Sequence, residues 1–198
     1  MLFIEKLEEL KREYGQDCVK RKNGTSLYGT DESMPLYARH KFFLPLSDAT
    51  IKEYLIDQYR YEIPIEYINF LKYSNGANLF NVKLKTKGFT ICHSMFVIYG
   101  LPRTQPFGRA RDLEEPYDIR IEDLSRHPGI SPVWLKCGSY TLETNFENTS
   151  DIFVDSTDGC VYSCQRKDDK IIQQWENLES CFCDLFDNFI QLKYEYCL

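Results

Sequence analysis

The side chains that could support catalysis are few in this sequence and are widely spaced. The three histidines are His40, His93 and His127, and none has the H-E-x-x-H spacing of zinc ligands on a helix. The glycine-rich signatures of phosphate and dinucleotide binding and the G-x-S-x-G signature of hydrolases are also missing from the sequence. We therefore predict that the protein is not an enzyme. A deep pocket around a cysteine or histidine with a strongly perturbed pKa would favour the opposite.

The eight cysteines do not have the spacing of a metal site. Cys160 and Cys164 lie four residues apart in a predicted strand, which separates them by about 13 Å, too far to share one zinc ion. Cys181 and Cys183 lie two residues apart in a predicted helix, where their side chains point to different faces. We therefore expect no metal, no cofactor, and reduced thiols that pack as small apolar groups.

Composition and charge limit the classes of partner. The 198 residues carry a net charge of −6 and are 43% apolar, so the chain can bury the core of one ordinary domain. No tract of lysine and arginine is present to displace the counterions of a nucleic acid, so we expect no nucleic-acid binding. The first ten residues lack the features of a signal peptide, and no apolar run reaches the roughly 18 residues that span a bilayer. We therefore expect a cytoplasmic protein without membrane contact.

Residues 109–123, called the acidic segment below, carry a cluster of carboxylates that could bind a basic protein. The carboxylates are those of Asp112, Glu114, Glu115, Asp118, Glu122 and Asp123. Tyr117 could anchor such a contact, since aromatic side chains supply much of the energy of protein interfaces. The alternative is a solvated loop of mixed charge, because Arg109, Arg111 and Arg120 lie in the same segment. We take the six carboxylates and Tyr117 as the candidate partner-binding residues.

The pattern of apolar residues predicts an α+β fold. Helical spacing indicates helices over residues 2–14, 49–59 and 178–192, and a central helix that begins near Pro64. Apolar segments bounded by turn residues indicate about six strands, at residues 78–82, 90–99, 132–138, 151–155, 160–164 and 170–175. Residues 16–34 are polar and predict a long loop or a loose hairpin, whereas residues 119–124 predict a helical turn.

These elements predict a mainly antiparallel, twisted sheet of about six strands, with N-terminal, central and C-terminal helices packed against it. Residues 1–46 would form an N-terminal helix and a polar extension, and residues 47–198 the main α+β domain. We expect the two parts to form one compact unit.

The central helix has the clearest boundaries. Pro64 fits the first helical turn, because its missing N–H has no intrahelical partner there. Tyr67, Phe70 and Leu71 supply an apolar face at spacings of three and four residues. Asn75-Gly76 ends the helix, since both residue types tolerate the left-handed conformation that closes one. The segment predicts a buried helix without a catalytic group.

The order of short motifs along the chain resembles the SUKH superfamily, which includes Smi/Knr-like cell-wall regulators and bacterial immunity proteins. The similarity covers about residues 47–192 and begins with Ile63-Pro64-x-x-Tyr67-x-x-Phe70-Leu71-x-x-Ser74-Asn75-Gly76. It continues with the strand end Ile98-Tyr99-Gly100-Leu101 and with the hairpin Gly159-Cys160-Val161-Tyr162. The chain departs from the family pattern at Ile63, where the family has leucine, and at Lys136-Cys137-Gly138, which lacks the usual apolar residue before its glycine.

The resemblance implies an α+β fold, a binding role, and no shared catalytic residues. The motif residues that it marks as structural are Pro64, Tyr67, Phe70, Leu71, Asn75, Gly76, Gly159, Val161 and Tyr162. Bacterial members of the family resemble antidotes that neutralise a cognate toxin, often a nuclease or deaminase, by direct binding. Nucleases are commonly basic, so an acidic antidote of such a toxin–antitoxin or polymorphic toxin system fits electrostatically. The alternative is a regulatory protein-interaction module of the Smi/Knr cell-wall signalling type.

Overall fold

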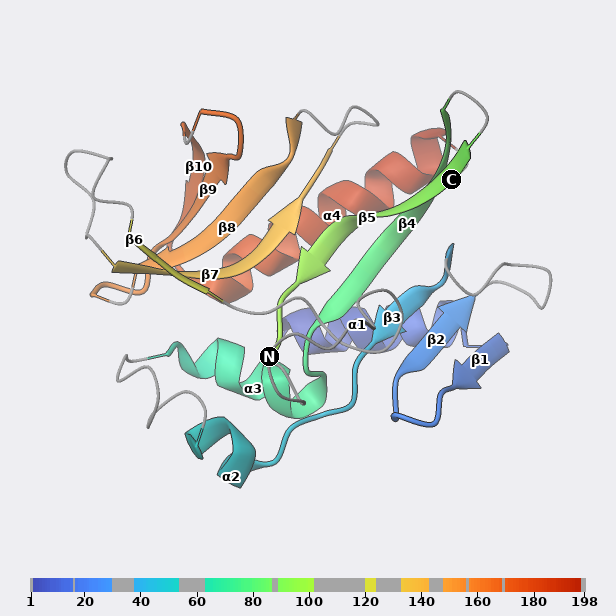
Figure 1. The fold of residues 1–198 in the computed structure, drawn as a ribbon, viewed down its shortest axis with the longest axis horizontal. Helices are drawn as coiled ribbons and strands as arrows, with labels where there is room; N and C mark the ends of the chain where they lie inside the picture. The colour runs from blue at the N-terminus through green and yellow to red at the C-terminus, as the bar shows by residue number, and fades with distance from the viewer. Residues whose placement is uncertain are drawn as a thin grey trace.

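Four helices and one sheet make up the regular structure in the part of the chain that the structure describes. The structure is a computed structural model, and it describes residues 2–15, 17–29, 38–53, 63–86, 89–101, 120–123, 133–142, 148–155, 157–168 and 170–196. Helix α1 (Leu2–Glu13) is the first element and α4 (Leu178–Tyr196) the last, with α2 (Asp48–Ile51) and α3 (Ile65–Tyr73) between them. Figure 1 shows α1 and α4 on the same side of the sheet, and α2 and α3 near one end of it.

The sheet is a single antiparallel one. In the described ranges, nine strands follow one another in the order β1-β2-β3-β4-β5-β7-β8-β9-β10, and β6 pairs with β7 beside this path. In chain order the strands are β1 (Asp17–Lys20), β2 (Ser26–Gly29), β3 (His40–Phe42), β4 (Ala77–Thr86), β5 (Phe89–Ile98), β6 (Arg120–Asp123), β7 (Val133–Tyr140), β8 (Ser150–Asp155), β9 (Val161–Gln165) and β10 (Ile171–Trp175).

The prediction of a sheet of about six strands is wrong, because β1, β2, β3 and β6 extend it. Residues 16–34 contain a regular hairpin in which Asp17 lies opposite Gly29, and residues 119–124 contain β6 rather than a helical turn. These strands are only three or four residues long and are rich in polar side chains. Ladder pairing with a neighbour, and not an apolar pattern of their own, places them in the sheet.

Strand β7 has two different neighbours along one of its sides. It pairs with β8 over residues 134–140, with a bulge between Lys136 and Gly138. On its other side, β6 pairs with residues 133–136 and β5 pairs with residues 138–140. The short strand β6 therefore continues the ladder where β5 leaves it.

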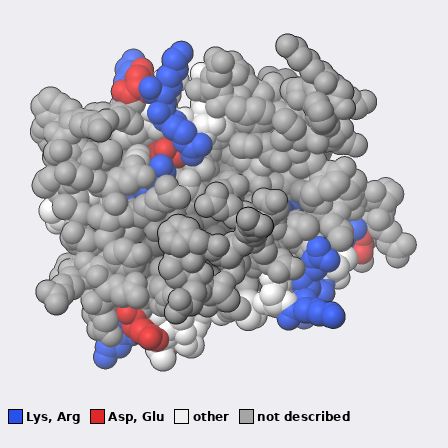
Figure 2. All heavy atoms as spheres, viewed as in Figure 1, with Lys and Arg blue, Asp and Glu red and all other residues white. Residues whose placement is uncertain are grey.

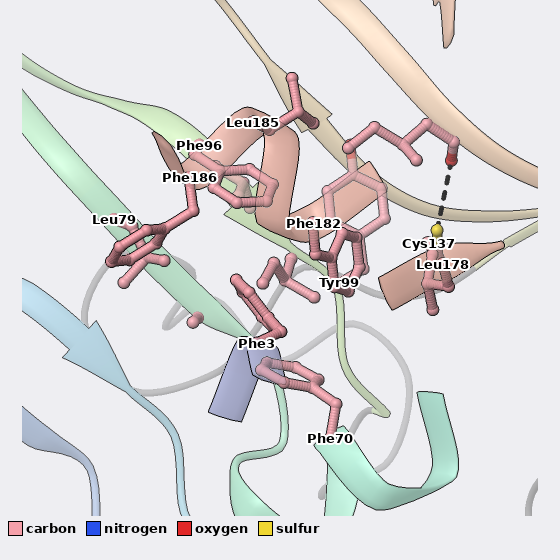
Figure 3. Close-up of a cluster of buried hydrophobic side chains, with 14 of the residues drawn as sticks. Phe3, Phe70, Leu79, Phe96, Tyr99, Cys137, Leu178, Phe182, Leu185 and Phe186 are labelled. Atoms are coloured by element: carbon pink, nitrogen blue, oxygen red, sulfur yellow. Dashed lines mark hydrogen bonds between the residues drawn. The ribbon is translucent and has the colours of Figure 1, made fainter. Parts of the chain in front are cut away.

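The main core lies between the sheet and helices α1 and α4. Apolar residues at spacings of three and four line one face of α4, as a buried helix requires. They are Leu178, Cys181, Phe182, Leu185, Phe186 and Phe189. Phe3 of α1 has its ring centre 5.1 Å from that of Phe182 and 6.1 Å from that of Phe70 in α3, so three helices meet there (Figure 3). Full burial of one such ring contributes about 1.5–3 kcal/mol.

Lys11 connects α1 to the N-terminal part of the sheet. Its Nζ lies 3.9 Å from the ring centre of Tyr73, 4.5 Å from that of Phe42 and 5.8 Å from that of Tyr28. The same Nζ lies 3.3 Å from Oε1 of Glu8. Burial lowers the pKa of Lys11, because the charged ammonium loses water. The three ring faces and the carboxylate offset that loss by attracting the cation.

Candidate functional site

Helix α3, which carries the motif that begins at Ile63-Pro64, supports the backbone of residues 99–101. Pro64 precedes its first turn with φ −52° and ψ 136°, and its carbonyl accepts hydrogen bonds from the N–H groups of Tyr67 at 2.9 Å and Ile68 at 3.1 Å. The helix ends at Tyr73, and Ser74 is extended. The buried side chains of Tyr67, Phe70 and Leu71 pack into the main core.

Asn75 has a role that differs from the helix stop predicted for it. Its backbone does not adopt a positive φ, whereas Gly76 has a φ of +89°. The fully buried Asn75 side chain instead binds Leu101, with Nδ2 donating to the Leu101 carbonyl at 2.7 Å. The Leu101 N–H in turn donates to Asn75 Oδ1 at 2.6 Å. The asparagine of the motif therefore ties the end of α3 to the chain that follows β5.

Two more motif residues complete this junction, which we call the α3 clamp (Tyr67, Asn75 and residues 99–101). The Tyr67 hydroxyl donates to the Tyr99 carbonyl at 2.7 Å. Complete burial raises the pKa of Tyr67 well above its ordinary value, because the phenolate could not be solvated there. A Cβ on Gly100 would lie 2.4 Å from the Asn75 carbonyl oxygen, so only glycine permits this close approach. Tyr67 and Asn75 are among the residues that the motif predicts as structural, whereas Gly100 is a motif residue for which no role is predicted. The α3 clamp shows the contacts of all three.

The candidate partner-binding residues are only partly placed. Asp112, Glu114, Glu115, Tyr117 and Asp118 lie outside the described residues. Glu122 and Asp123 belong to β6, where Glu122 pairs with Trp134 and Asp123 with Val133. Figure 2 shows one face of the molecule, on which the described charged side chains lie in separate small groups near the margin. Of the acidic segment, the structure therefore describes residues 120–123, which pair with β7 in the sheet.

A second hydrophobic cluster lies on the face of β7, β8 and β9 that is opposite to the main core. Trp134, Phe153 and Tyr162 belong to this cluster, whereas their chain neighbours Leu135 and Val161 belong to the main core, as strand alternation requires. The rings of Trp134 and Tyr162 are stacked, with centres 4.6 Å apart and planes 12° apart. The motif residues Val161 and Tyr162 therefore serve opposite faces. Gly159 supplies the tight turn before them, with a φ of +76°.

A charged group lies beside these rings. Asp151 Oδ2 lies 2.8 Å from Lys136 Nζ, and Oδ1 lies 2.6 Å from Arg166 Nη2. The side chains of Lys136 and Asp151 are only 12% and 7% exposed, whereas that of Arg166 is 52% exposed. Its hydrogen bond with Asp151 raises the pKa of Arg166 above its ordinary value. We call Trp134, Phe153, Tyr162, Lys136, Asp151 and Arg166 the outer-face cluster.

The outer-face cluster is suited to binding. Trp134 and Phe153 are buried, so what the cluster presents to a partner is the partly exposed Tyr162 ring and the guanidinium of Arg166. The buried carboxylate of Asp151 fixes the position of that guanidinium, and aromatic and arginine side chains are common in protein-binding hot spots. Burial raises the pKa of the Cys137 and Cys181 thiols, which makes them poor nucleophiles. Within the described ranges, no group of three or more histidine, cysteine, aspartate or glutamate side chains is placed to hold a metal ion.

Sequence reasoning did not single out the charged members of the outer-face cluster. Lys136 and Asp151 lie in two separately predicted strands, and only the pairing of β7 with β8 brings them together. The signal available was the presence of opposite charges within two otherwise apolar strands. Without the register, however, that signal does not identify a pair.

Comparison with families of known proteins, with characterised proteins and with solved structures finds no match. The resemblance to the SUKH superfamily thus stays a prediction from the motifs. None of the helices in the described ranges is long and apolar enough to cross a membrane.

Proposed function

We propose that this chain is a non-enzymatic binding protein of the SUKH immunity type. It would neutralise a basic toxin, a nuclease or deaminase domain, by direct binding in the cytoplasm. The observation that carries the proposal is the position of the acidic segment between two fixed points of the fold. Before it, the α3 clamp holds residues 99–101 through Tyr67 and Asn75. At its end, β6 holds residues 120–123 against β7.

Fixed ends make a binding segment more effective. A segment whose ends are already ordered loses less conformational entropy when it binds, so more of the contact energy contributes to affinity. The carboxylates of the acidic segment, in a chain of net charge −6, would also attract a basic partner over a distance and speed its association. The fixed ends and the negative charge of the segment both favour a role in which the motif residues shape the binding segment and do not themselves contact the partner.

The test first examines the gene next to that of this chain, and a toxin domain encoded there is the probe. Association is measured by stopped-flow fluorescence at low salt and at high salt. We expect the double variant Glu114→Lys/Glu115→Lys to associate about tenfold more slowly than the wild type at low salt. The difference should shrink at high salt, because the Debye length then falls to a few ångströms.

A matched control separates a local effect from a change in net charge. Glu5 and Glu53 are exposed and lie far from the acidic segment in sequence. The variant Glu5→Lys/Glu53→Lys has the same net charge as the test variant and should associate at nearly the wild-type rate. Equal slowing by both variants would reject the acidic segment as the docking surface, and absence of any complex would reject the proposed toxin.

A second candidate function follows from the outer-face cluster. Arg166 and Tyr162 are partly exposed there, and Arg166 is oriented by Asp151. A regulatory interaction module could bind its partners through this sheet face. A complex that is weakened by Arg166→Ala and is unaffected by Glu114→Lys/Glu115→Lys would favour this second function over the first.

A further inference from the structure

Among the described residues, the sheet ends in two edge strands, β1 and β10, and the β10 edge carries an exposed apolar side chain. In the described part of the chain, β10 pairs with β9 alone. Figure 1 shows β10 at the margin of the sheet. Ile172, the second residue of this short strand and the one at its bulge, is 52% exposed, and Gln173 and Gln174 are exposed as well. An edge strand with free backbone groups and an exposed large apolar residue is a ready template for pairing with another strand.

A shallow pocket adjoins the same edge. Its volume is about 420 Å³, and its lining includes Tyr140, Leu142, Lys170, Ile171 and Ile172. Leu142 is 41% exposed, so two of the most exposed large apolar side chains in the described structure, Leu142 and Ile172, line one hollow. A strand added to β10 would cover part of this surface.

The charges that flank β10 are arranged for self-recognition. Lys170 precedes the strand and Glu176 follows it, and both side chains are exposed. Neither forms a salt bridge with another described residue. When two copies of one strand pair antiparallel around a two-fold axis, the beginning of each copy lies opposite the end of the other. Lys170 of one copy would then face Glu176 of the other, twice in each interface.

We propose that β10 is a docking edge for a second copy of this chain, which pairs with it antiparallel to form a two-fold dimer. In this register Gln173 lies on the two-fold axis and Ile172 lies opposite Gln174 of the second copy, so the two Ile172 side chains are diagonal neighbours across the axis. At the opposite edge of the sheet, the charge of Asp17 in β1 is already paired within the chain. Asp17 forms a salt bridge with the buried Arg39 and so does not offer a free charge to a second copy. A β10–β10 contact is closed by its symmetry, so it produces a dimer and not a fibre.

The size of the contact sets its strength. Stable dimers usually bury more than about 1,000 Å², and the contact here is a single ladder with at most five residues from each copy. The bulge between Ile171 and Gln173 also twists the edge and limits the length of the ladder. The dimer is therefore weak and depends on concentration and salt.

Sedimentation equilibrium of the full chain at low salt, over a wide range of concentrations, tests the proposal. The weight-average mass of the wild type should rise from 23.4 kDa toward twice that value as concentration increases. Lys170→Glu places two like-charge pairs in the interface, and so does Glu176→Lys. Each variant alone should dimerise at least about tenfold more weakly than the wild type.

Two combinations of the charge reversals restore the opposite-charge pairs and so make the test specific. An equimolar mixture of Lys170→Glu and Glu176→Lys recreates both opposite-charge pairs, and so does the double variant Lys170→Glu/Glu176→Lys. Both should dimerise like the wild type. Lys167→Glu serves as the matched control, since Lys167 is also exposed but lies further from β10, whereas Lys170 directly precedes the strand. A wild type that stays monomeric at every concentration, or restored arrangements that do not dimerise, would overturn the proposal. Dimers that none of the reversals weakens would place the contact elsewhere and overturn it too.

Discussion

The side chain of Asn75 holds the backbone of Leu101 by two hydrogen bonds, one donated by its Nδ2 at 2.7 Å and one accepted by its Oδ1 at 2.6 Å. This repeats the paired bonds of opposed residues in an antiparallel sheet, with an amide side chain in place of a strand residue. Asn75 and Leu101 are both buried, so no water can replace these bonds. The asparagine of the motif is therefore a tether between α3 and the chain after β5.

The first prediction concerns this tether. Asn75→Leu keeps the approximate volume of the side chain but leaves the N–H and carbonyl of Leu101 without partners. We expect the free energy of unfolding to fall by about 2–4 kcal/mol, since each buried backbone group left unsatisfied costs about 1–3 kcal/mol. Urea denaturation measures the change. The control is Asn69→Leu on the exposed side of α3, which should alter stability by less than about 0.5 kcal/mol. Equal effects of the two variants would show that the tether contributes little.

The second prediction compares two glycines that are required for different reasons. Gly100→Ala would place a Cβ 2.4 Å from the Asn75 carbonyl oxygen, a backbone atom that can move only by shifting the α3 clamp. Gly159→Ala meets no atom within 4 Å but must adopt a φ of +76°. We expect losses of about 2–3 kcal/mol for Gly100→Ala from overpacking and about 1 kcal/mol for Gly159→Ala from backbone strain. Thermal denaturation ranks the two, and a larger loss at Gly159 would contradict the prediction.

The elements with strong apolar periodicity could be predicted from the sequence, and those held by pairing alone could not. In α4, apolar residues recur every three or four positions, because one face packs on the core. β1 reads Asp-Cys-Val-Lys and β6 reads Arg-Ile-Glu-Asp, so neither has a pattern that distinguishes it from a loop. Each of them pairs with another strand, and the sequence does not specify that strand or the register of the pairing. This is why the predicted sheet had too few strands.

The candidate site shows the same division. Residue types and spacing identified Tyr67, Asn75 and Gly100 as parts of motifs, but their hydrogen bonds join positions about thirty residues apart. The outer-face cluster depends on two strand pairings and on a bulge in β7, none of which is visible in residue types alone. The sequence alone does not show which residues of distant strands lie opposite each other.

The third prediction concerns the charged part of the outer-face cluster. Asp151→Asn removes the counter-charge of the buried Lys136 and should lower the free energy of unfolding by about 3 kcal/mol, because an uncompensated charge is then left out of water. Arg166 is 52% exposed, so solvent screens its interaction, and Arg166→Ala should cost about 1 kcal/mol or less. Urea denaturation distinguishes these outcomes. If the two variants lost similar amounts of unfolding free energy, burial would not determine how much each ion pair of Asp151 contributes to stability.

The last prediction concerns stability at alkaline pH. Burial raises the pKa of Tyr67, Tyr99 and Tyr140 above the ordinary value of 10.0, and that of Cys137 above its ordinary value of 9.0. Because each folded-state pKa exceeds the unfolded one, the unfolded chain loses these protons first. The stabilisation is complete below the unfolded pKa and is lost as pH rises toward the folded pKa. We therefore expect the free energy of unfolding to be level with respect to these groups near pH 7. It should then fall above about pH 9, with a slope of up to about 1.4 kcal/mol per pH unit for each group.

Tyr67→Phe isolates one of these contributions. The variant should be about 1–2 kcal/mol less stable at pH 7, since the Tyr99 carbonyl loses its donor. Above pH 10, its stability should fall less steeply than that of the wild type, because one group no longer titrates. Urea denaturation at pH 7, 8.5, 9.5 and 10.5 measures both slopes. If the two proteins lost stability in parallel above pH 10, the buried hydroxyl of Tyr67 would not be a source of the alkaline sensitivity.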